Sequence, residues 1–211
     1  MWVRCLRGGD NAGVSDQPTD AVAAVTAATA VVLCGGTARR FGSDKTQALL
    51  GDRPLLDHLL ANLPSDWPVA CVGPPRPTTR DVRWVREDPP GGGPVAALAA
   101  ALPLVATPVV VVLGGDMPYA AGLAPDLVAR LGAHPAVDAV AGRDDEGRTQ
   151  PLLAAYRLGP LARALPEPAT GTPLMRLLDA LRVETVEAHW PLTLDVDTPQ
   201  DLEAARHRLE P

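Results

Sequence analysis

Apolar positions along the chain follow two alternating patterns. Some form short continuous runs, such as VVVVL at 109–113, which are typical of parallel strands buried on both faces of a sheet. Others recur at helical spacing, as in 123–131, which is typical of an amphipathic helix. The predicted strands are 30–33, 69–72, 82–85, 109–113, 137–141, 152–156 and 183–187. The predicted helices are 55–62, 95–102, 123–131, 159–165, 172–181 and 198–209.

The order of these elements predicts the fold class. Strands that alternate with helices form an α/β fold, and we expect a single-domain, doubly wound, mostly parallel sheet. Ligands of such sheets bind at the carboxyl ends of the strands. We expect residues 28–211 to form this domain. Residues 1–27 show no periodicity and are expected to be a flexible N-terminal extension.

Composition narrows the function classes. Hydrophobic residues make up 46% of the chain and charged residues 21%, which favours a globular protein over a disordered one. The net charge of −6 and the aromatic content of 3% argue against a nucleic-acid partner. No apolar run approaches the roughly 18 residues of a membrane span. Three cysteines without metal-ligand spacing indicate reduced thiols, and hence a cytoplasmic location.

The most informative segment reads VVLCGGTARRFGSDK, from residue 31 to residue 45. A strand that ends in Gly35 and Gly36 lets backbone N–H groups approach a phosphate closely, because no Cβ intervenes. Arg40 and Lys45, together with Arg39, add cations at the same place, which suits a polyphosphate. The spacing matches neither a Walker A loop nor a G-x-G-x-x-G dinucleotide loop.

Carboxylates follow two other apolar stretches. Asp116 comes just after the run 109–113, and Asp195 and Asp197 lie in the segment LDVDTPQDL. Mg²⁺ bound to a triphosphate requires one or two such hard ligands, with water at its other positions. Asp116 and Asp197 are therefore the predicted metal ligands, with Asp195 as the alternative to Asp197. The residues that follow have a structural role, because Thr198, Pro199 and Asp201 form the start of a helix with a capping box.

A third segment, EDPPGGGP at 87–94, contains three consecutive glycines. Glycines of this kind allow a loop to wrap closely around a base or sugar. The predicted helix 95–102 follows at once.

The glycine pair, arginine, glycine and Asp-Lys of the first segment resemble the L-x-G-G-x-x-x-R-(M/F)-G-x-D-K signature of the MobA-like nucleotidyltransferases. Asp116-Met117-Pro118 resembles the D-x-P element of that family, and DVDTP resembles its N-x-N-T-P or D-x-D-T-P element. The resemblance covers about residues 29–209. It implies the Rossmann-type fold of the nucleotide-diphospho-sugar transferases.

The same resemblance implies the chemistry. In the molybdenum cofactor branch of the family, GMP passes from GTP to the phosphate of a molybdopterin, pyrophosphate leaves, and Mg²⁺ assists. Arg40, Lys45 and Asp116 would be the catalytic residues. The implied nucleotide-binding residues are Leu33, Cys34, Gly35, Gly36, Lys45, Asp88, Gly91, Gly93 and Asp116. Gln150 and Pro151 resemble a segment on the acceptor side, and transient contacts with other molybdenum cofactor proteins are implied as well.

Two alternatives stay open at this point. One is a cytidylyltransferase that acts on the same pterin or on another small phosphorylated acceptor; the pair Gly35-Gly36 favours guanine over cytosine. The other is a catalytically idle domain that only binds a nucleotide. The set of Lys45, Asp116 and Asp197 argues against the idle domain, because mere binding does not require a metal site.

Overall fold

The computed structural model describes residues 27–35 and 45–208. The expected extension at 1–27 lies outside this range except for its last residue. Gly36, Arg39 and Arg40 also lie outside it, so their predicted roles remain predictions.

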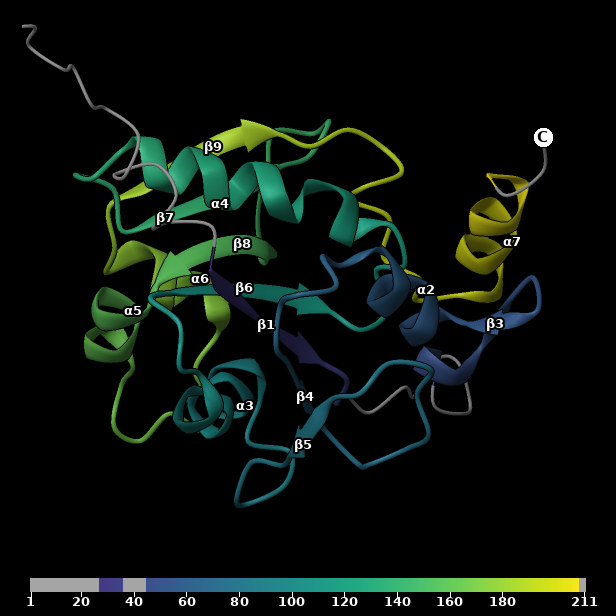
Figure 1. The fold of residues 1–211 in the computed structure, drawn as a ribbon, viewed down its shortest axis with the longest axis horizontal. Coiled ribbons are helices and arrows are strands. Elements are labelled where there is room, and N and C mark those ends of the chain that lie inside the picture. The colour runs from purple at the N-terminus through teal and green to yellow at the C-terminus, as the bar shows by residue number, and fades with distance from the viewer. Residues whose placement is uncertain (1–26, 36–44, 209–211) are drawn as a thin grey trace, which may run out of the picture.

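The centre of the molecule is a seven-stranded sheet with strand order β5-β4-β1-β6-β8-β7-β9 among the described residues (Figure 1). Its strands are β1 (Ala28–Leu33), β4 (Val69–Val72), β5 (Arg83–Val85), β6 (Val109–Gly114), β7 (Ala139–Arg143), β8 (Thr149–Arg157) and β9 (Val183–Glu187). All of the predicted strands are therefore present, with end points shifted by a few residues. The predicted α/β class is confirmed.

The sheet is mostly parallel, as predicted. Strand β8 is the exception and pairs antiparallel with both β6 and β7. The connection from β7 to β8, residues 144–148, is too short for the crossover that a parallel pair requires, so the chain turns back as a hairpin. The remaining neighbours in the sheet, including β1 with β6 and β7 with β9, are parallel.

Helices cover both faces of the sheet, as the continuous apolar strands predict (Figure 1). Helices α2 and α4 share one core with Val32, whereas α3, α5 and α6 share the other with Val31. Neighbouring residues of a strand point to opposite faces, which explains why both must be apolar. The helices are α2 (Leu55–Asn62), α3 (Pro94–Ala101), α4 (Ala124–Ala133), α5 (Leu158–Ala164), α6 (Leu174–Asp179) and α7 (Pro199–His207), with 3-10 turns η1 (Lys45–Gln47), η2 (Leu102–Leu104) and η3 (Ala120–Leu123).

A small hairpin, β2 (Leu49–Leu50) with β3 (Arg53–Pro54), was not predicted. Its two-residue strands are too short to produce a recognisable pattern of apolar positions. Leu50 of this hairpin packs with Leu55, Val196, Leu202 and Ala205 in a third core. Packing in this third core holds α7 beside the carboxyl end of the main sheet (Figure 1).

Helix α7 begins as predicted. The Thr198 side chain accepts a hydrogen bond from the Asp201 N–H, and the Asp201 side chain accepts one from the Thr198 N–H, which completes a capping box. Among the described residues, none of the helices is long and apolar enough to cross a membrane.

Candidate active site

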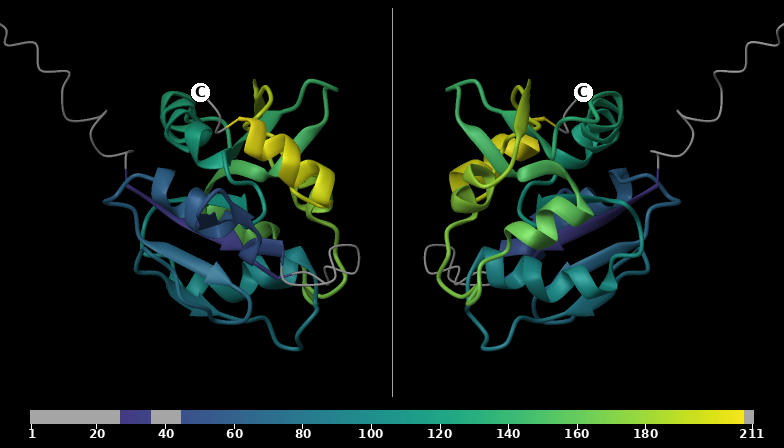
Figure 2. Two further views of the ribbon diagram at one scale, coloured as in Figure 1. Left: turned by 90° about the vertical axis from the view of Figure 1, so that its right-hand side faces the viewer. Right: turned by 90° about the vertical axis from the view of Figure 1, so that its left-hand side faces the viewer.

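The site lies where β1 and β6 end side by side. Leu33 pairs with Gly114 at the last position of both strands, and the N–H of Gly115 donates to the Leu33 carbonyl oxygen at 2.9 Å. The arrows of β1 and β6 point toward the side that holds α7 and the β2–β3 hairpin, and this side faces the viewer in the left panel of Figure 2. The predicted location at the carboxyl edge of the sheet therefore fits the observed topology.

Two glycines that the sequence analysis did not single out allow Asp116 to turn back into this edge. A Cβ on Gly114 would lie 2.7 Å from Asp116 Oδ1, and a Cβ on Gly115 would lie 3.1 Å from Cys34 Sγ. Both distances are shorter than ordinary van der Waals contact. A side chain at either position would push Asp116 or the end of β1 out of place.

The structure brings Lys45 together with three acids. The Lys45 ammonium contacts the Asp116 carboxylate, lies 2.5 Å from Asp197 Oδ1 and lies 3.7 Å from Asp195 Oδ1. We call Asp116, Asp195 and Asp197 the acidic triad. One carboxylate oxygen from each member lies within 4.8 Å of the other two. Both Asp195 and Asp197 belong to the triad. The choice of Asp197 over Asp195 as a metal ligand therefore stays a prediction.

Mutual proximity alters the ionisation of these groups. Partial burial disfavours the charged form of Lys45, but hydrogen bonds to Asp116 and Asp197 outweigh it and raise the Lys45 pKa above its usual value. Partial desolvation and repulsion from Asp116 raise the pKa of Asp195, against the opposing effect of Lys45. An ammonium among three carboxylates stabilises negative groups that would otherwise repel one another.

Backbone contacts fix the segment that carries Asp195 and Asp197. Val196 is fully buried in the third core, and its N–H donates to the Asp116 carbonyl oxygen at 3.1 Å. On the other side, Asp201 Oδ2 accepts the N–H of Asp197 at 3.1 Å and that of Thr198 at 2.7 Å. The capping box of α7 therefore also orients the acidic segment.

The chemistry of the triad fits a hard divalent cation. Three carboxylates within reach of one point supply the oxygen ligands that Mg²⁺ prefers, and their partial exposure leaves room for water and phosphate ligands. In the structure, the Lys45 ammonium lies among these carboxylate oxygens.

Comparison with known proteins identifies the family. The sequence profile of the MobA-like NTP transferase domain matches residues 30–186, which is most of the chain. The chain belongs to the MobA-like NTP transferase family. It is therefore an enzyme that transfers nucleotidyl groups, and the resemblance noted from the sequence is confirmed.

Individual members of the family match most of this chain over nearly their own full lengths. A protein of Natronomonas pharaonis, described as a probable molybdenum cofactor guanylyltransferase, is 33% identical over 210 residues, covering 86% of this chain and 98% of the relative. The molybdenum cofactor guanylyltransferase of Rhizobium johnstonii is 32% identical over 199 residues, covering 85% of this chain and 92% of the relative.

Solved structures confirm the fold. The molybdopterin-guanine dinucleotide biosynthesis protein A of Archaeoglobus fulgidus is similar with a TM-score of 0.64 at 24% identity, over 86% of this chain and 98% of the other. A 2-C-methyl-D-erythritol 4-phosphate cytidylyltransferase of Thermus thermophilus gives a TM-score of 0.62 at 20% identity, over 85% and 97%. At such identities the likeness concerns the fold alone.

The other predicted residues of this MobA-like protein are less tightly clustered. Leu33 and Cys34 are buried at the end of β1, and Gly35 is exposed beyond it. Gly91 and Gly93 have φ values of 82° and 92°, which few other residues adopt, in the loop after β5. Asp88, in the same loop, is exposed. No hydrogen bond or ion pair between described residues joins this loop to the acidic triad.

Residues near the expected acceptor side are engaged in a local network. Asp144, at the turn between β7 and β8, accepts hydrogen bonds from the Arg148 side chain at 3.0 Å and from Gln150 at 2.7 Å. Arg143 pairs with Glu187 of the neighbouring strand. These contacts shape the β7–β8 hairpin, and a role for Gln150 or Pro151 in acceptor binding stays a prediction.

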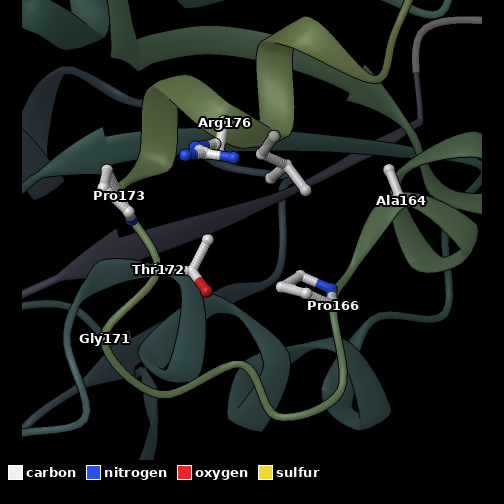
Figure 3. Close-up of a pocket in the computed structure, with 7 residues that line it drawn as sticks. Ala164, Pro166, Gly171, Thr172, Pro173 and Arg176 are labelled. Atoms are coloured by element: carbon white, nitrogen blue, oxygen red, sulfur yellow. The ribbon is translucent and has the colours of Figure 1, made fainter.

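A hollow lies beside the glycine-rich loop at 87–94. It has a volume of about 490 Å³, and Figure 3 shows Thr172 and Arg176 among its lining residues, between α6 and the preceding loop. The N–H of Gly171, in the loop before α6, donates to the Gly92 carbonyl oxygen at 2.8 Å. This bond joins the loop before α6 to the glycine-rich loop that leads into α3. The sequence offered no signal for this contact.

Sequence reasoning also missed Arg76. Its guanidinium contacts the Thr46 hydroxyl, lies 3.3 Å from the Cys34 carbonyl oxygen, and lies over the Trp84 ring at 5.3 Å. Arg76 is a single arginine in a proline-rich stretch, PPRPTT, so neither its spacing nor its neighbours pointed to the site.

Proposed function

We propose that this protein transfers GMP from GTP to the terminal phosphate of a molybdopterin, with Mg²⁺ and with release of pyrophosphate. The observation that carries the proposal is the contact of Lys45 with Asp116, Asp195 and Asp197 at the carboxyl edge of the sheet. The names of the curated relatives, which match along nearly their full lengths, support guanine and the molybdopterin acceptor.

The proposed reaction requires little covalent help from the protein. An oxygen of the acceptor phosphate attacks the α-phosphorus of GTP, a new P–O bond forms, and the bond to the departing pyrophosphate breaks. The acceptor is already an anion, so no general base is required. This agrees with the contexts of the histidines, since His58 bonds the Leu50 carbonyl and His134 and His189 bond Glu184 and Asp145.

The residues of the chain would align the substrates and balance charge. In the proposal, Asp116 and Asp197 hold the cation, with Asp195 beside them. When bound, Mg²⁺ neutralises phosphate charge and polarises the P–O bonds. Lys45 and Arg40 stabilise the negative charge that develops on pyrophosphate. The ends of β1 and the loop at 87–94, with Asp88, Gly91 and Gly93, would bind the base and ribose.

A cytoplasmic location is part of the proposal. Cys34 and Cys71 are both free thiols in the structure, as expected for a protein of a reducing compartment. Transient contacts with other proteins that handle the molybdenum cofactor are also part of the proposal.

The decisive experiment measures pyrophosphate release with each of the four NTPs, in the presence of Mg²⁺ and molybdopterin. The proposal expects release with GTP and little with the others. Release with CTP instead would identify a cytidylyltransferase, the activity named for one structural neighbour. No release with any NTP, together with a thermal shift on nucleotide addition, would identify an idle binding domain.

A further inference from the structure

Arg76 bridges two parts of the site that are separated along the chain. It lies in the segment that leaves the carboxyl end of β4 and is partly buried. The Nη1 group contacts the Thr46 hydroxyl, Nη2 lies 3.3 Å from the Cys34 carbonyl oxygen, and Nε lies 3.2 Å from the Pro74 carbonyl oxygen. The three donors of one planar group thus engage two distant stretches of chain and the local backbone at Pro74.

The two distant partners of Arg76, Cys34 and Thr46, lie on either side of residues 35–45, the segment predicted to bind phosphate, which we call the phosphate loop. Cys34 follows the last residue of β1, and Thr46 follows Lys45 in η1. The Thr46 side chain is packed in place, since the residue is only 3% exposed. A guanidinium has a fixed fork of donors, so holding both partners sets the separation between the two ends of the loop.

Further contacts hold Arg76 itself in place. Its guanidinium lies over the Trp84 ring at 5.3 Å from the centroid, within the range of a cation–π contact. Gly73, with φ of 147°, brings the end of β4 close to the end of β1; a Cβ there would lie 3.2 Å from the Cys34 carbonyl carbon. Because the ends of β4 and β1 lie close together, the Arg76 side chain contacts the Cys34 carbonyl oxygen.

We propose that Arg76 is a positioning residue that clamps the two ends of the phosphate loop and thereby holds Lys45 against the acidic triad. The inference rests on the proposed function, because it assigns the clamped loop to the triphosphate of the nucleotide. Arg76 acts through Thr46 and Lys45 rather than by touching the reacting atoms.

The test compares Arg76→Met, Arg76→Lys and Thr46→Val with a matched control, Arg83→Met, which removes an exposed arginine from neighbouring β5. Arg76→Met should raise the KM for GTP about tenfold while the Tm without nucleotide changes little. Arg76→Lys should rescue poorly, because an ammonium cannot hold both partners in one plane. The control should behave like the wild type.

A double-mutant cycle separates the clamp from a merely structural arginine. The kcat/KM of the double variant Arg76→Met, Thr46→Val should be no lower than that of Arg76→Met alone, because both changes remove the same Arg76–Thr46 contact. Effects that simply add, or a value of kcat/KM within twofold of the wild type for Arg76→Met, would overturn the proposal.

Amide hydrogen exchange tests the clamp without any assumption about activity. The Ala48 N–H donates to the Lys45 carbonyl oxygen at 2.9 Å, so loosening of η1 should speed exchange at Ala48 in Arg76→Met but not in Arg83→Met. Should the wild type release no pyrophosphate from any NTP, the proposed function fails, yet faster exchange at Ala48 would still support the clamp. Unchanged exchange would refute it.

Discussion

The backbone N–H of Val196 donates to the carbonyl oxygen of Asp116 at 3.1 Å. This bond joins the loop after β6 to the segment before α7. It sets Asp195 and Asp197 on either side of a fixed point, so that both carboxylates approach the Lys45 ammonium. The acidic triad is thus held by main-chain geometry.

Asp116→Asn should lower the turnover of GTP about a hundredfold, because it removes one preorganised charge from the proposed metal site. Steady-state pyrophosphate release measures the effect. Asp126→Asn, an exposed change in the first turn of α4, serves as the control and should have no effect. A near-normal rate for Asp116→Asn would reject its role as a ligand.

Lys45→Met should have opposite effects on two ligands. Without the ammonium, the triad should bind Mg²⁺ about tenfold more tightly in the absence of nucleotide, because its repulsion is no longer balanced. Binding or turnover of GTP should fall at the same time, because a cation for the phosphates is lost. Calorimetric titration with Mg²⁺ and kinetics with GTP measure the two, and Arg53→Met is the control. Equal Mg²⁺ affinity in the wild type and in Lys45→Met would contradict this electrostatic balance.

Val196→Ala should weaken the third core and loosen the acidic segment. Removing two buried methyl groups costs about 2 kcal/mol of unfolding free energy, and kcat should drop severalfold as Asp195 and Asp197 lose their fixed positions. Urea denaturation and pyrophosphate release measure these effects. Val183→Ala, on the partly buried edge strand β9, should affect kcat little. A loss of activity as large in Val183→Ala would point to general destabilisation instead.

Asp144→Asn should reduce stability in a pH-dependent way. The backbone N–H of Arg148, together with the Arg148 and Gln150 side chains, lowers the Asp144 pKa to about 2. A lowered pKa contributes stability that is complete above the unfolded-state value of about 3.9 and is lost as the pH falls through 2. The difference between wild type and Asp144→Asn should therefore be largest above about pH 4, shrink as the pH falls, and vanish below about pH 2. Urea unfolding at several pH values would show it; a difference that does not depend on pH would contradict the assignment.

The regular parts of the fold could be predicted because their physics is local. A run such as 109–113 is apolar throughout because both faces of β6 are buried, and Thr198 with Asp201 forms a cap whatever surrounds it. The β2–β3 hairpin could not be predicted, since its strands have two residues each and owe their position to packing against α7.

The candidate site likewise contains residues that the sequence identified and residues that it did not. Lys45 was identified from the glycine- and cation-rich segment after β1, and Asp116 and Asp197 from carboxylates that follow apolar stretches. A mostly parallel sheet gathers its ligands at the carboxyl ends of its strands. Arg76 was not identified, because its partners Cys34 and Thr46 are brought to it only by the folded chain. The neighbouring glycines 114 and 115 gave no signal either, since the requirement for them arises from Asp116 and Cys34 in space.

By itself, the sequence determined the α/β class, the edge of the sheet that binds ligands, and the types of charged group placed there, because each depends on short stretches of chain. Only the tertiary structure decided that Asp195 joins Asp116 and Asp197 around Lys45, and that Arg76 ties the two ends of the loop. Those relationships depend on strand order and on the docking of α7, which bring together residues with no regular spacing along the chain.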